Sequence, residues 1–168
     1  QGSRPVTPQV YLQLVRDGST VTGGAAFTPS FTGPAVYNDK AKFKTIKFED
    51  IDKNKVDIEK QAADGWVSMI QHYFASAWLV NEPGNREFFV RKLPGQAGVR
   101  GDAYATGMVF TLPTLAPGAS TTQTATLFAG PQEENKLAKL APGLERVKDY
   151  GMLTILAEPL FWLLDKLH

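Results

Sequence analysis

Short stretches of alternating apolar and polar residues, separated by turn-forming residues, run from about residue 8 to residue 130. In the first stretch, Val10, Leu12 and Leu14 alternate with less apolar neighbours until Arg16–Gly18 breaks the run. Because side chains on a strand point alternately to opposite faces, this pattern is typical of strands with one buried face and one wet face. The 15 glycines and 11 prolines leave little room for long helices. The sequence therefore predicts a mostly β, antiparallel β-sandwich.

Further strands are predicted from the same alternation, and their boundaries follow the turn residues. In Lys42–Phe48 the apolar positions change parity between Phe43 and Ile46, which a β-bulge would explain. The sign-alternating stretch Glu49–Lys60 is interpreted as a solvated turn. The remaining strands are expected within residues 65–80, 87–92, 103–112 and 120–129.

The densest candidate core lies in residues 65–80, where helical and strand spacing compete. Frequent aromatic and β-branched residues favour strands, and Asn81–Gly84 then forms a hairpin turn. The expected core positions of this stretch are Trp66, Met69, Tyr73, Phe74 and Trp78.

The pattern changes after Gly130, which divides the chain into a sandwich part, 1–130, and a helical part, 131–168. A short helix is predicted over 132–141, with Pro131 near its start. A second helical segment is predicted over 150–168, and Pro159 should kink it. We expect this segment to lie at a membrane surface, or else to pack on the sandwich, because polar residues interrupt it before it is long enough to span a bilayer. Its apolar positions are Leu153, Leu156, Leu160, Phe161, Trp162, Leu163, Leu164 and Leu167.

Composition excludes several classes of function. The 18 basic residues nearly balance 17 acidic ones, which argues against nucleic acid as a partner. With no cysteine, thiol nucleophiles and cysteine-bound metals are excluded. His72, Ser76 and Asp64 offer catalytic residue types, but on one strand His72 and Ser76 would lie about 13 Å apart, so His72 is interpreted as structural. We expect no catalytic residues, no cofactor and no metal site.

The carboxylates of the 49–60 stretch are interleaved with lysines, and a solvated turn is a better interpretation than a cation site. The run Lys40, Lys42, Lys44 and Lys47 surrounds Phe43. Such a pairing occurs in oligonucleotide-binding sheets, but a phenylalanine pointing into the core is simpler. The chain starts without methionine and stops inside an apolar pattern, so we expect a fragment of a longer protein.

Several segments, in order along the chain, carry a family resemblance, and residues 11–17 and 31–35 are the weaker matches among them. The stretch 65–78, GWVSMIQHYFASAW, is similar to the signature of the periplasmic domain of YidC-type membrane protein insertases, of the Oxa/Alb/YidC family. Residues 127–132, 140–144 and 149–155 resemble the end of that domain, and residues 158–164 resemble the interfacial helix before the family's second membrane span.

The resemblance implies the latter part of a supersandwich like that of galactose mutarotase, on the periplasmic face of the bacterial inner membrane. The full-length proteins of this family are multi-pass inner-membrane proteins that insert and fold nascent membrane proteins, alone or with the Sec translocon and its SecDF accessory. The resemblance thus implies a non-catalytic scaffold. Two alternatives remain open, a carbohydrate-binding or mutarotase-like sandwich and a periplasmic holdase chaperone.

Overall fold

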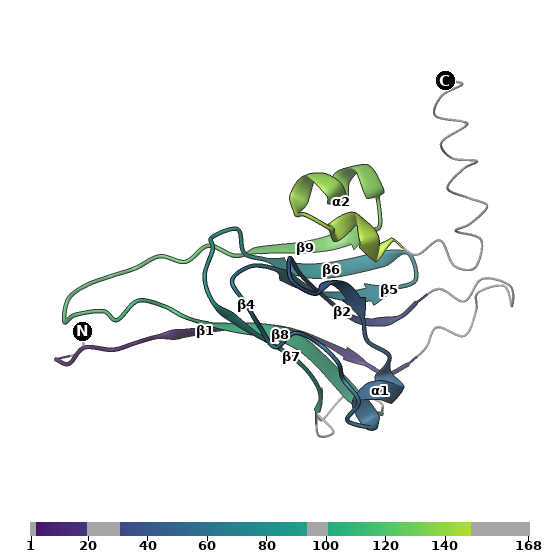
Figure 1. The fold of residues 1–168 in the computed structure, drawn as a ribbon, viewed down its shortest axis with the longest axis horizontal. Coiled ribbons are helices and arrows are strands. Elements are labelled where there is room, and N and C mark those ends of the chain that lie inside the picture. Colours follow the sequence, from purple (N-terminus) through teal and green to yellow (C-terminus); the bar gives the residue numbers. More distant parts are fainter. Residues whose placement is uncertain (1–2, 20–30, 94–100, 149–168) are drawn as a thin grey trace, which may run out of the picture.

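The strands form two antiparallel sheets that pack face to face in a computed structural model, which describes residues 3–19, 31–93 and 101–148 (Figure 1). One sheet has four strands in the order β1-β8-β7-β4, and the other has five in the order β3-β2-β5-β6-β9. The strands are β1 (Gln9–Asp17), β2 (Gly33–Asn38), β3 (Lys42–Thr45), β4 (Gln61–Ala62), β5 (Trp66–Gln71), β6 (Phe74–Leu79), β7 (Arg86–Leu93), β8 (Ala103–Thr111) and β9 (Thr126–Pro131). The helices are α1 (Phe48–Asp52), α2 (Glu134–Leu140) and the 3-10 turn η1 (Leu144–Val147).

Strand β1 of the four-stranded sheet confirms the alternation that predicted it. Strand β1 pairs with β8 along its whole length, from Gln9 opposite Thr111 to Asp17 opposite Ala103. The even-numbered apolar residues Val10 and Leu12 face the interior of the sandwich, while Tyr11 is exposed. The core between the sheets is completed by Val36, Ile46, Ile51, Val67, Val80, Phe88, Tyr104, Met108 and Phe110.

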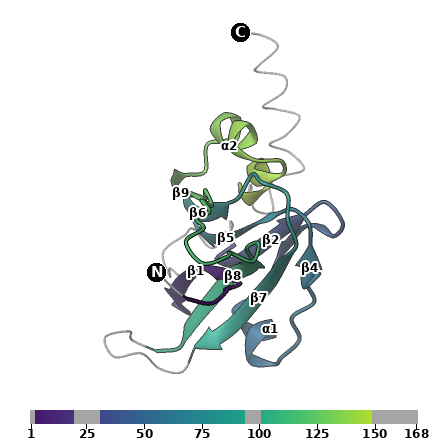
Figure 2. The same ribbon diagram turned by 90° about the vertical axis from the view of Figure 1, so that its left-hand side faces the viewer.

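The five-stranded sheet is covered on both faces, contrary to the expected wet face. Figures 1 and 2 show α2 lying on the side of this sheet that faces away from the other sheet. Every residue of β2 is buried as a result, and so are the first five residues of β5. Val36 and Val67 face the other sheet, whereas their neighbours Tyr37 and Trp66 face the helices. A strand buried on both sides has no polar face, because both sets of alternating side chains leave water.

The parity change after Phe43 marks the end of a strand, and the expected bulge is wrong. Strand β3 ends at Thr45, and the Ile46 N–H then donates to the Pro34 carbonyl at 2.9 Å. Phe43 packs toward the helices and Ile46 toward the other sheet. The two residues therefore belong to different hydrophobic cores, one on each face of the five-stranded sheet. Residues Phe48–Asp52 form α1, where the sequence predicted only a turn.

Two predicted boundaries also change. Residues Asn81–Gly84 do not close a hairpin, because β6 and β7 belong to different sheets and this segment crosses between them. The last strand is shorter than the expected 120–129 and runs from Thr126 to Pro131. Pro131 therefore ends a strand, and α2 starts three residues later, at Glu134, within the predicted helical segment.

Candidate functional site

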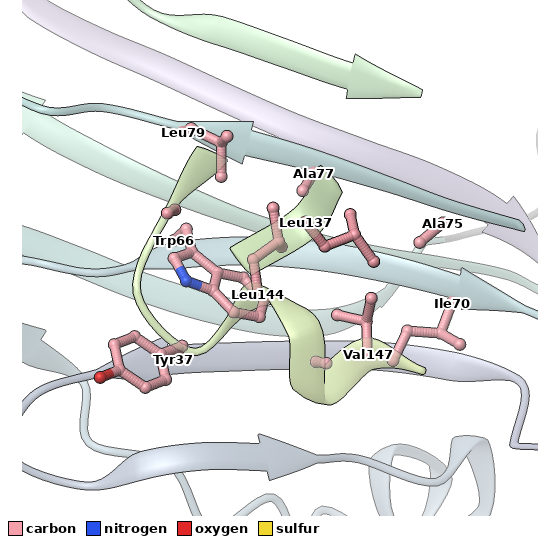
Figure 3. Packing of buried hydrophobic residues seen from close by; sticks show 11 residues of the cluster. Tyr37, Trp66, Ile70, Ala75, Ala77, Leu79, Leu137, Leu144 and Val147 are labelled. Carbon is pink, nitrogen blue, oxygen red and sulfur yellow. The ribbon is translucent and has the colours of Figure 1, made fainter. Parts of the chain in front are cut away.

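The outer face of the five-stranded sheet holds the last elements that the structure describes. Three side chains from α2 and η1, Leu137, Leu144 and Val147, are almost completely buried against this face. Figure 3 looks onto this face and shows the three side chains among the sheet residues, with Val147 next to Ile70. We call this contact the latch, formed on the helix side by Leu137, Ala141, Leu144 and Val147 and on the sheet side by Ala35, Tyr37, Trp66, Ile70, Ala75, Ala77 and Leu79.

Trp66 joins the two sides of the latch. Its indole is 2% exposed, and its Nε1–H donates to the Pro142 carbonyl at 2.9 Å. The indole also stacks on Tyr37, with ring centroids 5.5 Å apart and planes 9° apart. A buried indole N–H needs an acceptor, and the bend between α2 and η1 supplies one. The Trp66 side chain therefore fixes both the sheet and the turn that covers it.

Gly143 allows the chain to make that turn. Its φ is +75°, in the left-handed region where a side chain is unfavourable. A Cβ built on Gly143 would lie 2.4 Å from Cε2 of Tyr37, so the backbone approaches the ring as closely as a glycine allows. The Tyr37 ring is in turn held by its hydroxyl, which donates to Asp39 Oδ1 at 3.0 Å.

A cavity of about 250 Å³ opens beside the latch, at the end of the sheet where β5 begins. Arg86 is buried in its wall and donates to the carbonyls of Gly65, at 2.5 Å, and Glu82. Burial lowers the pKa of the Arg86 guanidinium, and the nearby Asp64 carboxylate opposes that shift. Asp64 accepts the Asp39 N–H at 3.1 Å. These contacts tie loops together, which is a structural use of the charged groups around the cavity.

Tyr37 and Asp39 influence each other in the cavity wall. Burial, and then the hydrogen bond to Asp39, raise the pKa of the Tyr37 hydroxyl. The same hydrogen bond is the main cause that lowers the pKa of Asp39. A phenol with a raised pKa stays protonated at neutral pH, so it serves as a donor and not as a base.

The residues once considered for catalysis are far apart. Asp64 precedes β5 and His72 follows it, so the six-residue strand separates them by roughly 20 Å. Ser76 lies on β6 opposite Met69, and its carbonyl accepts the Ser68 hydroxyl at 2.9 Å. His72 sits in the β5–β6 turn with φ +29° and contacts Tyr73 edge-on at a centroid distance of 3.9 Å. The three side chains form no catalytic constellation.

Of the expected core positions in residues 65–80, some are buried and others are exposed. Trp66 and Met69 are buried, and Trp78 is partly buried, with its Nε1–H donating to the Gln13 carbonyl at 3.1 Å. Tyr73 and Phe74 are 70% and 58% exposed, so the prediction that they belong to the core is wrong. The reason is the hairpin turn between β5 and β6, which places both side chains at the tip of the sheet.

The charged stretches are paired locally. Lys40 bonds Glu59 at 2.8 Å, and Lys44 bonds Asp57 at 2.8 Å, so these lysines are partnered with carboxylates and do not form an open basic face. Lys92 contacts Asp52 at 3.0 Å and Asp102 at 2.6 Å. Among the residues that the structure describes, no group of three or more His, Asp or Glu side chains is arranged to hold a metal ion.

The apolar positions expected at a membrane surface, from Leu153 to Leu167, lie outside the described residues. Within residues 3–19, 31–93 and 101–148, no helix has the length and apolar character that crossing a membrane requires. The latch residues of α2 and η1 were missed from the sequence, whereas Trp66 on the sheet side was an expected core position. Leu137, Leu144 and Val147 are apolar residues in a polar stretch, but Pro142 and Gly143 interrupt any helical spacing between them, so no periodic signal pointed to them.

Comparison with known proteins identifies the fold described above. Residues 1–163 match the family model of the YidC periplasmic domain. Membrane protein insertase YidC of Cupriavidus necator is 53% identical over 99% of this chain, and those of Cupriavidus taiwanensis and Ralstonia nicotianae are 51% and 50% identical over the same share. The chain spans 29% of the length of each of these relatives. The match extends over both sheets and the latch, and the chain belongs to the YidC periplasmic domain family, as part of an inner-membrane insertase.

Proposed function

We propose that this domain is a non-catalytic periplasmic scaffold that fixes the start of a membrane-contacting tail in a membrane protein insertase. The observation that carries the proposal is the latch, which holds the last described elements on the outer face of the five-stranded sheet. The tail begins where the latch ends. Its proposed membrane-facing residues are Leu153, Leu156, Leu160, Phe161, Trp162, Leu163, Leu164 and Leu167.

The point at which the tail leaves the sandwich is held by several contacts. Val147, at the end of η1, is buried in the latch. The next residue, Lys148, pairs with Glu134 at the start of α2 at 3.3 Å. A segment that starts from buried and paired residues loses much of its freedom of direction, whereas a flexible linker would leave the two parts independent. A scaffold of this kind would set where the following membrane segments begin.

The absence of an enzymatic role is also part of the proposal. The charged and aromatic groups around the cavity hold loops together, because Arg86 binds two carbonyls and Asp64 binds the Asp39 amide. The proposed partners are nascent membrane proteins, the Sec translocon and its SecDF accessory, together with the membrane surface that the tail contacts. The similarity to YidC insertases supports these partners at the level of the whole protein.

The test uses the full-length insertase that carries this domain and compares two leucines of α2. Leu137 is buried in the latch and Leu140 is 41% exposed on the same helix. Leu137→Asp buries a charge in the latch, which should detach α2 and η1 from the sheet. Leu140→Asp adds the same charge at a more exposed position. We expect Leu137→Asp to lower insertion of a single-span reporter protein several-fold at equal expression, and Leu140→Asp to leave it unchanged.

Limited proteolysis of both variants reports whether the latch has opened. If Leu137→Asp exposes new cleavage sites between residues 134 and 148 but the reporter is inserted at the normal rate, the scaffold proposal is wrong. If both variants lose insertion equally, the effect comes from added charge and also contradicts the proposal.

A further inference from the structure

The β5–β6 turn presents an aromatic tip, made of His72, Tyr73 and Phe74. The two strands pair from Trp66 opposite Leu79 to Gln71 opposite Phe74, which leaves a two-residue turn. His72 adopts φ +29°, an uncommon conformation for a residue with a side chain. Tyr73 is 70% exposed and Phe74 is 58% exposed, the two largest exposed fractions among the large hydrophobic residues that the structure describes. The fold thus holds two aromatic rings in water at the end of a rigid hairpin.

The tip lies at the end of the sheet where the described segment 101–148 also ends. Val147, one residue before the end of the described segment, packs with Ile70, two residues before the turn. Figure 3 shows these two side chains together near the end of β5, and Figure 1 shows the same arrangement of η1 and β5 in the whole fold. The neighbouring strand is joined to the tip through Gln132, whose N–H donates to the Tyr73 carbonyl at 3.0 Å. The aromatic tip and the last described residues, Val147 and Lys148, therefore lie at the same end of the five-stranded sheet.

The size of the tip decides which kind of partner fits it. At about 200 Å² per aromatic side chain, the exposed fractions of Tyr73 and Phe74 amount to roughly 250 Å². A stable protein interface needs about 800 Å² from each partner, so the tip is too small to hold a protein by itself. A bilayer surface accepts a small protrusion, because a tyrosine places its ring among the acyl chains and its hydroxyl among the headgroups.

The strands that meet at the tip carry no acidic side chain, and the carboxylates that follow the last of them, Glu133 and Glu134, pair with Lys136 at 2.8 Å and Lys148 at 3.3 Å. Residues 69–76 and 126–132 contain no Asp or Glu, so the sheet strands that end here would not be repelled by an anionic leaflet. We propose that the β5–β6 tip inserts Tyr73 and Phe74 into the bilayer interface and acts as a second membrane contact beside the tail. This inference rests on the proposed function, because it assumes that the tail brings this end of the sandwich to the membrane.

The test uses the absence of cysteine from the chain. Tyr73→Cys is labelled with an environment-sensitive fluorophore in the 168-residue chain and mixed with phosphatidylethanolamine–phosphatidylglycerol vesicles. The matched control is Val6→Cys, an exposed apolar residue that precedes β1 and is 54% exposed. We expect a several-fold fluorescence increase and quenching by nitroxide-labelled lipid at position 73, with neither change at position 6. Far-UV circular dichroism confirms that both labelled chains are folded.

A second variant separates the tip from the tail. The double change Tyr73→Ser with Phe74→Ser should lower vesicle binding of the chain several-fold, whereas Val6→Ser with Leu127→Ser should not. If the chain binds vesicles but position 73 shows no fluorescence change, the tip proposal is wrong and the tail proposal stands. If the unaltered chain does not bind vesicles at all, both are wrong.

Discussion

Replacing Gly143 with alanine should show how much of the stability of the domain depends on the latch. Gly143 has φ +75°, and a Cβ at this position would lie 2.4, 2.7 and 3.0 Å from three atoms of the Tyr37 ring. The ring cannot easily move away, because it is buried, stacks on Trp66 and hydrogen-bonds to Asp39. Gly143→Ala must therefore either shift the α2–η1 turn or displace the ring from its stack.

The expected loss has two parts. A side chain in the left-handed region costs about 1 kcal/mol relative to glycine. Overpacking against a buried ring adds about 1–3 kcal/mol, which brings the total to about 2–4 kcal/mol. Gly118→Ala is the matched control, because Gly118 has φ +80° and a Cβ there would meet nothing within 4 Å. Its loss should be about 1 kcal/mol, so the difference between the two variants measures the contact with Tyr37.

Urea unfolding of the 168-residue chain, followed by tryptophan fluorescence, gives both free energies. A typical domain has only about 5–15 kcal/mol of stability, so the predicted loss is readily measured. If Gly143→Ala costs no more than Gly118→Ala, the turn does not press on Tyr37 as described, and the reasoning that makes the latch rigid is refuted.

Three further predictions concern buried and charged side chains. In the described residues the buried Thr106 hydroxyl has no hydrogen-bond partner. Thr106→Val should therefore raise the free energy of unfolding in urea by about 1 kcal/mol. A lower free energy of unfolding would mean that the hydroxyl has a partner. Leu137→Ala should lower the free energy of unfolding by about 2–5 kcal/mol in the same assay, because Leu137 is fully buried. Leu140→Ala, at a more exposed position, should lower it by less than about 1 kcal/mol. Equal losses for the two variants would contradict the latch. The hydrogen bond from Lys92 lowers the pKa of Asp52 from 3.8, so this carboxylate stabilises the fold above its unfolded pKa, and the contribution is lost as pH falls through the lowered value. Asp52→Asn should therefore be less stable than the parent near neutral pH, with the gap closing in acid; a gap independent of pH would contradict this.

Strands β1, β7 and β8 of the four-stranded sheet could be predicted from sequence, and β1 follows the alternating rule along its length, whereas the two-residue strand β4 was not predicted. Val10 and Leu12 alternate with exposed residues, and the predicted strand at 103–112 matches β8 to within one residue. The five-stranded sheet departs from that rule, since it is buried on both faces. Phe43 and Ile46 differ in parity because they belong to different cores, a fact that depends on where α2 packs.

The turn at the tip could not be predicted from residue preferences. Neither His72 nor Tyr73 is a usual turn former, and both lie inside an apolar run, so the sequence placed Tyr73 and Phe74 in the core. The Asn81–Gly84 segment has stronger turn residues and looked like the hairpin, but it carries the chain between sheets. The pairing partner decides between a hairpin and a crossover, and that information is not local.

The resemblance to YidC-type insertases came from short segments, and the comparisons confirmed the family over nearly the whole chain. The latch explains physically why two of those segments belong together. Trp66 is the second residue of the first segment, and its indole N–H donates to the Pro142 carbonyl of a later one, 76 residues further along the chain. The contact between the Trp66 indole and the Pro142 carbonyl gives both segments a structural role.

Flotation with vesicles tests the central claim most directly, namely that the apolar tail is a membrane contact. The 168-residue chain is mixed with phosphatidylethanolamine–phosphatidylglycerol vesicles and centrifuged through a density gradient, beside a variant with Leu156→Ser, Leu160→Ser and Leu163→Ser. We predict that the unaltered chain rises with the vesicles and that most of the variant stays at the bottom. An unaltered chain that remains at the bottom, or a variant that rises equally, would contradict the account.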